Sequence, residues 1–408
     1  MKRALPFLLT VIFVLSAALP DSHAIPAFAR KYKISCSTCH SPFPRLKPYG
    51  DDFAGDAMIL KEEENKRLYV QGGDELLWLN KDFPVAARFE AFAQYDQDQP
   101  VKKDLQTPWG LKLLSGGALY KNIGYYFYFY MSEHGEVAGI EDAYIHFDNI
   151  FNSKVDVMVG QFQTSDPLMK RELRLPYEDY MIYKQKFGYT GTNLTYDRGI
   201  MLVYGIEQTG TDIIAMVVNG NGKPEAVDGK FDNDDYKNVG FRISQGIGNL
   251  LSIGGFFYRG KEIFYDEILS AQQKQTNEIT YWGPDFNLGI GPIEITGQYL
   301  IRTDSKLQVP CEALGDMVCA GGVKTFAEKV EAKGIVLEAV FSPALDRSRT
   351  YFTALYNRID HDLDWYDYET ATLNGTYLLA RNLRAVAEYT RDLQYKKNRF
   401  TVGIVSGF

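Results

Sequence analysis

The chain has 408 residues, 14% of them aromatic, and 36 glycines, a composition that favours strands and tight turns. Its formal net charge of −8 excludes a nucleic-acid partner, because phosphate contacts need clustered lysine and arginine. A mean hydropathy of −0.24 argues against a bundle of membrane helices but allows a membrane β-barrel, in which every second residue faces water or the lumen.

Residues 1–24 have the features of a secretory signal peptide. Lys2 and Arg3 precede an apolar stretch, and Ser22-His23-Ala24 is a small-x-small cleavage site. We predict cleavage after Ala24 and export of the mature chain. The apolar stretch is shorter than the roughly 20 residues that a spanning helix needs, although a retained signal peptide would form a single anchor.

Residues 25–82 are predicted to form a small separate unit, rich in proline near its start. Within it, Cys36-Ser37-Thr38-Cys39-His40 is the C-x-x-C-H pattern of c-type haem attachment. Cys36 and Cys39 can bond to the two vinyl groups of one haem, and His40 then faces the iron as its proximal ligand. We therefore predict one covalent haem c.

Other chemistries are possible for the same residues. A disulfide or a thioredoxin-like redox pair is one alternative, but the flanking prolines deny the motif the long helix of such a pair. A zinc site would need two further ligands nearby, and His40 is the one candidate.

The sixth iron ligand is left open between three possibilities. Met58 follows His40 by eighteen residues within the same unit, and a Met/His pair is a known arrangement that raises the reduction potential. His146 lies on the face of a predicted strand that would point towards a lumen. The third possibility is an open or water-bound position.

Residues 83–408 are predicted to form a transmembrane antiparallel β-barrel of about 16 strands. Merging or splitting one pair would give fourteen or eighteen. The predicted strands are 83–95, 109–119, 123–131, 139–148, 154–162, 198–206, 211–219, 238–246, 250–260, 276–288, 293–303, 330–341, 350–360, 367–380, 383–392 and 399–408.

The connections between these strands alternate between short turns and long loops such as 163–197, 220–237, 261–275 and 304–329. Outer-membrane barrels have short periplasmic turns and long extracellular loops. Starting from a periplasmic N-terminus, every long loop falls on the outer side. The last strand alternates up to a terminal aromatic, Phe408, which favours a barrel over a soluble β-sandwich with similar alternation.

The predicted loops contain two further clusters. Cys311 and Cys319 lie eight residues apart in one loop, where an oxidising compartment favours a disulfide. A second loop contains Asp228, Asp232, Asp234 and Asp235, which could bind a divalent cation but lack the spacing of a defined calcium loop, so a solvated loop is favoured.

The N-terminal residues resemble the fused outer-membrane cytochrome–porins, a group that includes iron-oxidising outer-membrane cytochromes. The resemblance covers about thirty residues. It rests on Pro26-Ala27-Phe28-Ala29-Arg30, the Cys36 to His40 motif, and Pro44, Leu46, Gly50 and Phe53.

The resemblance implies haem attachment at Cys36 and Cys39, ligation by His40, and a barrel of similar strand number. Where the iron-oxidising members are basic and end in a Gly-aromatic pair, this chain has Asp51-Asp52 and Gly55-Asp56-Ala57-Met58. The resemblance therefore implies the haem-and-barrel architecture rather than iron as the donor.

Three functional hypotheses follow. The first is an outer-membrane cytochrome that transfers electrons between an extracellular donor or acceptor, iron among the candidates, and a periplasmic c-type cytochrome, and so acts as an electron-transfer oxidoreductase. The second is a diffusion porin for ions or small solutes with an accessory haem unit, its lumen lined by charges such as Arg88 and Glu90. A soluble haem enzyme is third, without a catalytic residue set to support it. The first two place the chain in the lipid of a bacterial outer membrane.

Overall fold

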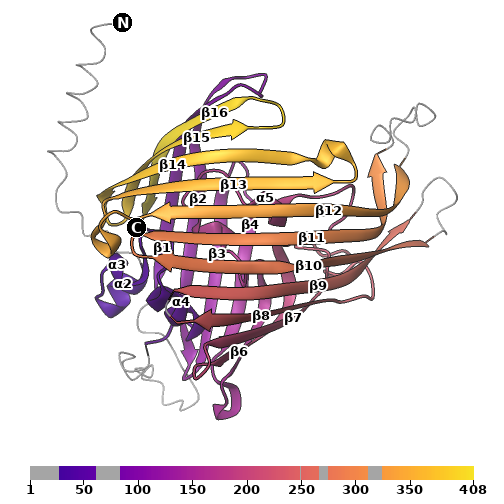
Figure 1. The fold of residues 1–408 in the computed structure, drawn as a ribbon. Helices are drawn as coiled ribbons and strands as arrows, with labels where there is room; N and C mark the ends of the chain where they lie inside the picture. Colours follow the sequence, from indigo (N-terminus) through magenta and orange to yellow (C-terminus); the bar gives the residue numbers. More distant parts are fainter. Residues whose placement is uncertain (1–26, 61–82, 249, 266–273, 311–323) are drawn as a thin grey trace, which may run out of the picture.

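The structure is a computed structural model, and it describes residues 27–60, 83–248, 250–265, 274–310 and 324–408. Its main body is a closed antiparallel barrel in which every strand pairs with its neighbours in sequence, and β1 closes on β16 (Figure 1). The predicted all-β barrel is confirmed. The predicted signal peptide, residues 25, 26 and 61–82 of the predicted haem unit, and Cys311 and Cys319 lie outside the described residues.

The described residues contain sixteen strands. They are β1 Val85–Asp96, β2 Lys103–Tyr120, β3 Ile123–Glu133, β4 Gly139–Phe147, β5 Val155–Gln163, β6 Tyr196–Ile206, β7 Thr211–Val218, β8 Asn238–Ile247, β9 Leu251–Tyr265, β10 Lys274–Ile290, β11 Ile293–Pro310, β12 Lys324–Phe341, β13 Thr350–His361, β14 Tyr368–Ala380, β15 Leu383–Asp392 and β16 Asn398–Gly407.

Each predicted strand overlaps one observed strand. The largest differences lie at the end of the barrel that carries the long loops, where β2 begins at Lys103 instead of 109, and β11 and β12 stay paired as far as Pro310 and Lys324. These extensions are rich in polar residues, so they lack the apolar alternation by which a strand is recognised from sequence.

Side chains alternate along each strand between an outer face, which is apolar, and an inner face, which encloses the lumen. In β13, Thr353, Leu355 and Asn357 are buried on the inside, whereas Phe352 on the opposite face is 51% exposed. Outward apolar side chains at every second position recur in other strands, as at Phe400, Val402 and Ile404 in β16. The outer surface is therefore apolar, as a wall surrounded by lipid requires. Of the helices described, none is both long and apolar enough to cross a membrane.

Residues 27–60, here called the plug, lie at the mouth of the barrel that carries the short turns. The plug contains three short helices, α2 Ala27–Tyr32, α3 Cys36–Cys39 and α4 Pro48–Gly55, which Figure 1 shows at the end of the barrel near the C-terminus. Arg30 donates to the carbonyl of Val85 at the start of β1. Arg45 forms an ion pair with Glu294 in β11, and Lys47 Nζ lies 2.6 Å from Asp346 Oδ2. Because short turns mark the periplasmic side, the plug occupies the periplasmic mouth.

The connection between β5 and β6, residues 164–195, folds back into the barrel. This lumen loop contains the 3-10 helix η2 Arg171–Leu173 and the helix α5 Met181–Lys184. Tyr180 and Tyr183 are buried, and their hydroxyls donate to Glu338 at 2.9 Å and to Gln298 at 3.2 Å. The loop joins its strands on the extracellular side, as predicted, and from there it folds into the lumen, which the sequence pattern did not predict. Its apolar side chains need burial, and the inner wall provides it.

Candidate haem site

The C-x-x-C-H motif forms one short helical turn in the plug. The Ser35 hydroxyl caps α3 by accepting from the backbone N–H of Ser37, and the His40 N–H donates to the Cys36 carbonyl at 2.9 Å. This turn places Cys36, Cys39 and His40 in the wall of a single cavity. Both thiols are free and partly exposed. The structure thus brings the three predicted attachment residues together.

His40 has the hydrogen bond that a haem ligand needs. Its Nδ1 lies 2.9 Å from the carbonyl oxygen of Pro44, an acceptor, so Nδ1 is the protonated nitrogen and Nε2 is left with its lone pair. Burial of the ring lowers the pKa of His40 and favours the neutral imidazole. A neutral imidazole with a fixed tautomer is the form that binds iron.

The cavity lies between the plug and the inner wall of the barrel. The plug contributes aromatic and aliphatic side chains, and β1 to β4 contribute polar and aromatic ones. Its lining includes Phe28, Phe43, Leu46, Phe53 and Met58 from the plug, and Arg88, Ser115, Tyr126, Tyr128, Asp142 and Tyr144 from the wall. Phe53 holds Phe28 and Tyr32 in edge-to-face contacts, with ring centroids 5.3 and 5.8 Å apart.

Met58 lines the same cavity as His40. A Cβ placed on Gly116 of β2 would lie 2.7 Å from the Met58 sulfur, so the thioether packs directly against the wall. The Tyr32 hydroxyl donates to the Met58 carbonyl at 3.3 Å and anchors this end of the plug. The plug therefore supplies a thiol pair, an imidazole and a thioether to one cavity, a donor set that fits a c-type haem.

The other candidate ligand, His146, does not line this cavity. It is buried on the inner face of β4, and its Nε2 has no hydrogen-bond partner in the part of the chain that the structure describes. His134 lines a different cavity, described below. Among the candidates named from sequence, Met58 is thus the one that the structure places beside the motif.

A redox-active dithiol fits these residues less well. Burial raises the pKa of both Cys36 and Cys39, so the thiols stay protonated at neutral pH. Reactive C-x-x-C pairs have a lowered thiol pKa instead.

Within the described residues, no group of three or more His, Cys, Asp or Glu side chains is arranged to hold a metal ion.

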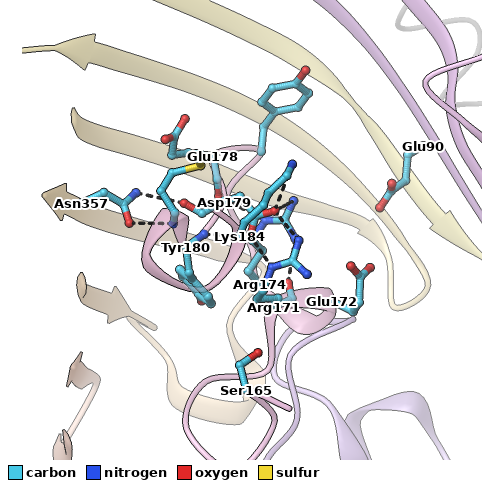
Figure 2. A network of polar contacts seen from close by, with 12 residues as sticks. Glu90, Ser165, Arg171, Glu172, Arg174, Glu178, Asp179, Tyr180, Lys184 and Asn357 are labelled. Carbon is cyan, nitrogen blue, oxygen red and sulfur yellow. Dashed lines mark hydrogen bonds and ion pairs between the residues drawn. The ribbon is translucent and has the colours of Figure 1, made fainter. Parts of the chain in front are cut away.

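A second cavity, here called the lumen chamber, lies between the lumen loop and the inner wall. Arg88 and Glu172 line both cavities. Figure 2 shows the lumen-loop side of the chamber, where Arg171, Arg174 and Lys184 gather near Asp179. Arg171 binds Asp179 through two hydrogen bonds of 3.1 and 2.7 Å.

The charges predicted for the lumen lie on the inner face of the wall. Most of them bind the lumen loop or the plug instead of facing water. Arg302 donates to the Thr192 carbonyl at 3.1 Å and Arg384 to the Leu175 carbonyl at 3.1 Å, while Arg242 pairs with Asp285 at 2.7 Å within the wall. The full predicted set is Arg88, Glu90, Arg242, Glu294, Arg302, Arg384 and Glu388.

The sequence pattern predicted no functional role for the residues of the lumen loop, Glu172 and Asp179 among them. The available signal was its composition. A 32-residue connection with many Tyr, Leu, Met and Ile residues is unusual for a solvated loop, and its Tyr177 to Tyr183 segment is largely buried.

Comparison with known proteins identifies the barrel but not the plug. No protein-family model matches the chain, and no curated protein matches it. Solved structures that match include OmpF of Salmonella typhi in complex with daunomycin (TM-score 0.55, 10% identity, 80% of this chain and 97% of that chain). An anion-selective porin from Comamonas acidovorans also matches (TM-score 0.54, 10% identity, 80% and 99%). So does a loop-deletion variant of OmpT, an outer membrane protein of Vibrio cholerae (TM-score 0.52, 13% identity, 80% and 99%).

These likenesses show a porin-like fold. A closed sixteen-stranded antiparallel barrel with an apolar outer surface is the architecture of bacterial outer-membrane proteins. The chain therefore resides in the outer membrane, with its wall in contact with lipid.

Two glycines of α4 provide a matched test of the site. A Cβ at Gly50 would lie 2.4 Å from the Cys39 carbonyl oxygen, whereas a Cβ at Gly55 would meet nothing within 4 Å. We expect Gly50→Ala to push α4 away from the motif and to lower the covalent haem content at least tenfold, measured as haem absorbance per chain after denaturation. Gly55→Ala should keep the wild-type content, because alanine favours a helix by about 0.5–1 kcal/mol. Equal haem contents in the two variants would contradict the packing argument.

Proposed function

We propose that this protein is an outer-membrane electron-transfer protein that binds one covalent haem c in the cavity between the plug and the barrel wall. One observation carries the proposal: Cys36, Cys39, His40 and Met58 line the same cavity, inside a porin-like barrel. A haem held there supplies a one-electron couple.

Each residue has a distinct role in this proposal. The Cys36 and Cys39 thiols would bond to the vinyl groups of the haem, and His40 Nε2 would ligate its iron, while His40 Nδ1 donates to the Pro44 carbonyl. Met58 is our candidate for the second protein ligand of the iron.

The surroundings of the cavity support the same proposal. Phe28, Phe43 and Phe53 give its plug side an aromatic, apolar lining. Arg88 and Lys170 are basic side chains in its lining, paired with Glu90 and Asp51, and they are our candidates to contact the propionate groups.

The position of the plug defines the two sides from which partners approach. The plug closes the periplasmic mouth, where a soluble c-type cytochrome can reach it. The apolar band of such a barrel is about 25 Å tall, so an extracellular donor or acceptor must approach through the lumen. The lumen chamber offers that route, because it shares Arg88 and Glu172 with the haem cavity and extends to Glu133 and His134 at the extracellular end of β3. Iron is our candidate substrate.

A second function is diffusion of ions or small solutes through the barrel. The comparisons support it more directly than electron transfer, because the solved structures that match include porins, one of them described as anion-selective. The charged lining of the lumen chamber is also suited to a solute pathway. In this second function the haem unit is an accessory of the channel.

The haem proposal is tested by removing the thiols. Protein purified from outer membranes should show a Soret band that stays with the denatured chain, and a Cys36→Ala/Cys39→Ala variant should lose it. A Cys311→Ala/Cys319→Ala variant, which also removes two cysteines, should keep it. In isolated outer membranes, ferrous or ferric iron should change the redox state of the haem. Wild-type protein without covalent haem would contradict the proposal.

The role of Met58 is tested by redox titration. A Met/His pair raises the potential of a haem, so Met58→Leu, which removes the sulfur but keeps the bulk, should lower the midpoint potential and shift the Soret band. Met131→Leu is the control, since Met131 is exposed in β3. An unchanged potential and spectrum in Met58→Leu would show that the sulfur is not a ligand.

Conductance in planar bilayers separates the two functions. The plug at one mouth and the lumen loop inside should hold the single-channel conductance of the full chain at least tenfold below that of an open sixteen-stranded porin measured in parallel. A conductance equal to that of the open porin would favour diffusion as the main role.

A further inference from the structure

The lumen chamber has a volume of about 380 Å³, within the roughly 300–1,000 Å³ typical of small-molecule sites. Seven basic and five acidic side chains line it. The basic ones are Arg88, Lys112, Arg171, Arg174, Lys184, Arg384 and Arg399, and the acidic ones are Glu90, Glu133, Glu172, Glu178 and Asp179. The lining therefore carries an excess of positive charge.

The acidic side chains of the lumen loop form ion pairs with basic neighbours. Asp179 accepts two hydrogen bonds from Arg171, and its Oδ2 also lies 3.6 Å from Arg174 and 3.7 Å from Lys184. Glu172 pairs with Lys112 at 3.2 Å.

Three basic side chains of the wall, Arg88, Lys112 and Arg399, are paired in the same way. Glu90 pairs with Arg88 and with Lys112, the latter at 3.4 Å. Glu178 pairs with Arg399. These carboxylates therefore neutralise neighbours other than Arg384.

Arg384 forms no ion pair within the described residues. It is 3% exposed, and its Nη1 donates to two neutral oxygens, the Leu175 carbonyl at 3.1 Å and Thr376 Oγ1 at 3.4 Å. Its Nε has no hydrogen-bond partner in the part of the chain that the structure describes, and the charges of Glu90 and Glu388 act on Arg384 from a greater distance than that of an ion pair. The nearby Glu388 instead accepts from the backbone N–H groups of Tyr177 and Glu178.

We propose that the lumen chamber binds a small oxyanion, a carboxylate or a phosphate, with Arg384 as its principal charge partner. A buried guanidinium that lacks a counter-charge is costly, and an anion in the chamber supplies that charge. The planar donor fork of arginine matches carboxylate and phosphate oxygens. This site stands apart from the haem, because Arg384 does not line the haem cavity.

The chamber follows the inner wall across several neighbouring strands. Arg384 lies near the periplasmic end of β15, and Glu133 and His134 lie at the extracellular end of β3. An anion in the chamber therefore lies in the same cavity as Arg88, which also lines the haem cavity. If the proposed electron transfer holds, the chamber favours an anionic redox substrate, such as a carboxylate complex of a metal, over a free metal cation.

Calorimetric titration of the full-length holoprotein in detergent at low ionic strength tests the site, with inorganic phosphate and citrate as separate probes. We expect saturable binding of at least one probe, and the stronger one identifies the oxyanion class. Arg384→Gln should weaken that binding at least tenfold. Arg384→Lys, which keeps the charge but loses the planar fork, should be intermediate. Arg347→Gln, in an exposed periplasmic turn, should bind like wild type.

Each titration is paired with two independent readouts. Strand content and resistance to unfolding by unheated detergent report the barrel, and the Soret band reports the haem, so a failure of the haem proposal is distinguished from a failure of this one. If Arg384→Gln does not fold, Arg384→Lys and the weakening of wild-type binding by sodium chloride carry the test. Absence of saturable binding of both probes to wild type, or wild-type affinity in the folded Arg384 variants, would overturn the proposal.

Discussion

The constraint on which the whole structure depends is that lipid offers no hydrogen-bond partner to a peptide group. Every N–H and carbonyl in the wall must therefore pair with another strand, and the pairing of β1 with β16, from Arg88 opposite Gly407 to Asp96 opposite Arg399, removes the last free edges. Closure also divides the side chains by parity. One face meets lipid, and the other encloses a space that must be filled by protein or water.

The chain fills much of that space with itself. The lumen loop presents aromatic and aliphatic side chains, and glycines of the inner wall leave room for them. A Cβ on Gly334, for example, would lie 2.4 Å from Ile182. Buried polar groups on the wall are satisfied by the loop backbone, as when Glu262 accepts from the Gly191 N–H at 2.6 Å. A buried charge without such a partner would be costly, so inward charges and an inward loop depend on each other.

The wall could be predicted from sequence because its signals are local. Alternation and turn residues lie within about ten residues of each other, and all sixteen strands were identified with small differences at their ends. The attachment motif is equally local. The inward position of the lumen loop was not predicted, because it depends on contacts such as that of Tyr180 with Glu338, 158 residues apart. The same holds for Arg384, whose lack of a counter-charge is visible only when the loop backbone at Leu175 lies beside it.

The plug and the lumen loop also contact each other, which joins the two ends of the molecule. Lys170 of the loop lies 2.7 Å from Asp51 in α4, and the residues that follow it, Glu172 and Leu173, line the cavity of Cys36 and His40. The Lys170–Asp51 pair is partly exposed, and such pairs contribute only about 0–1 kcal/mol. The loop is instead held by its aromatic anchors in the wall. A change of charge in the haem cavity would therefore act on the loop mainly through Arg88 and Glu172, which line both this cavity and the lumen chamber. The exposed Lys170–Asp51 pair would contribute less.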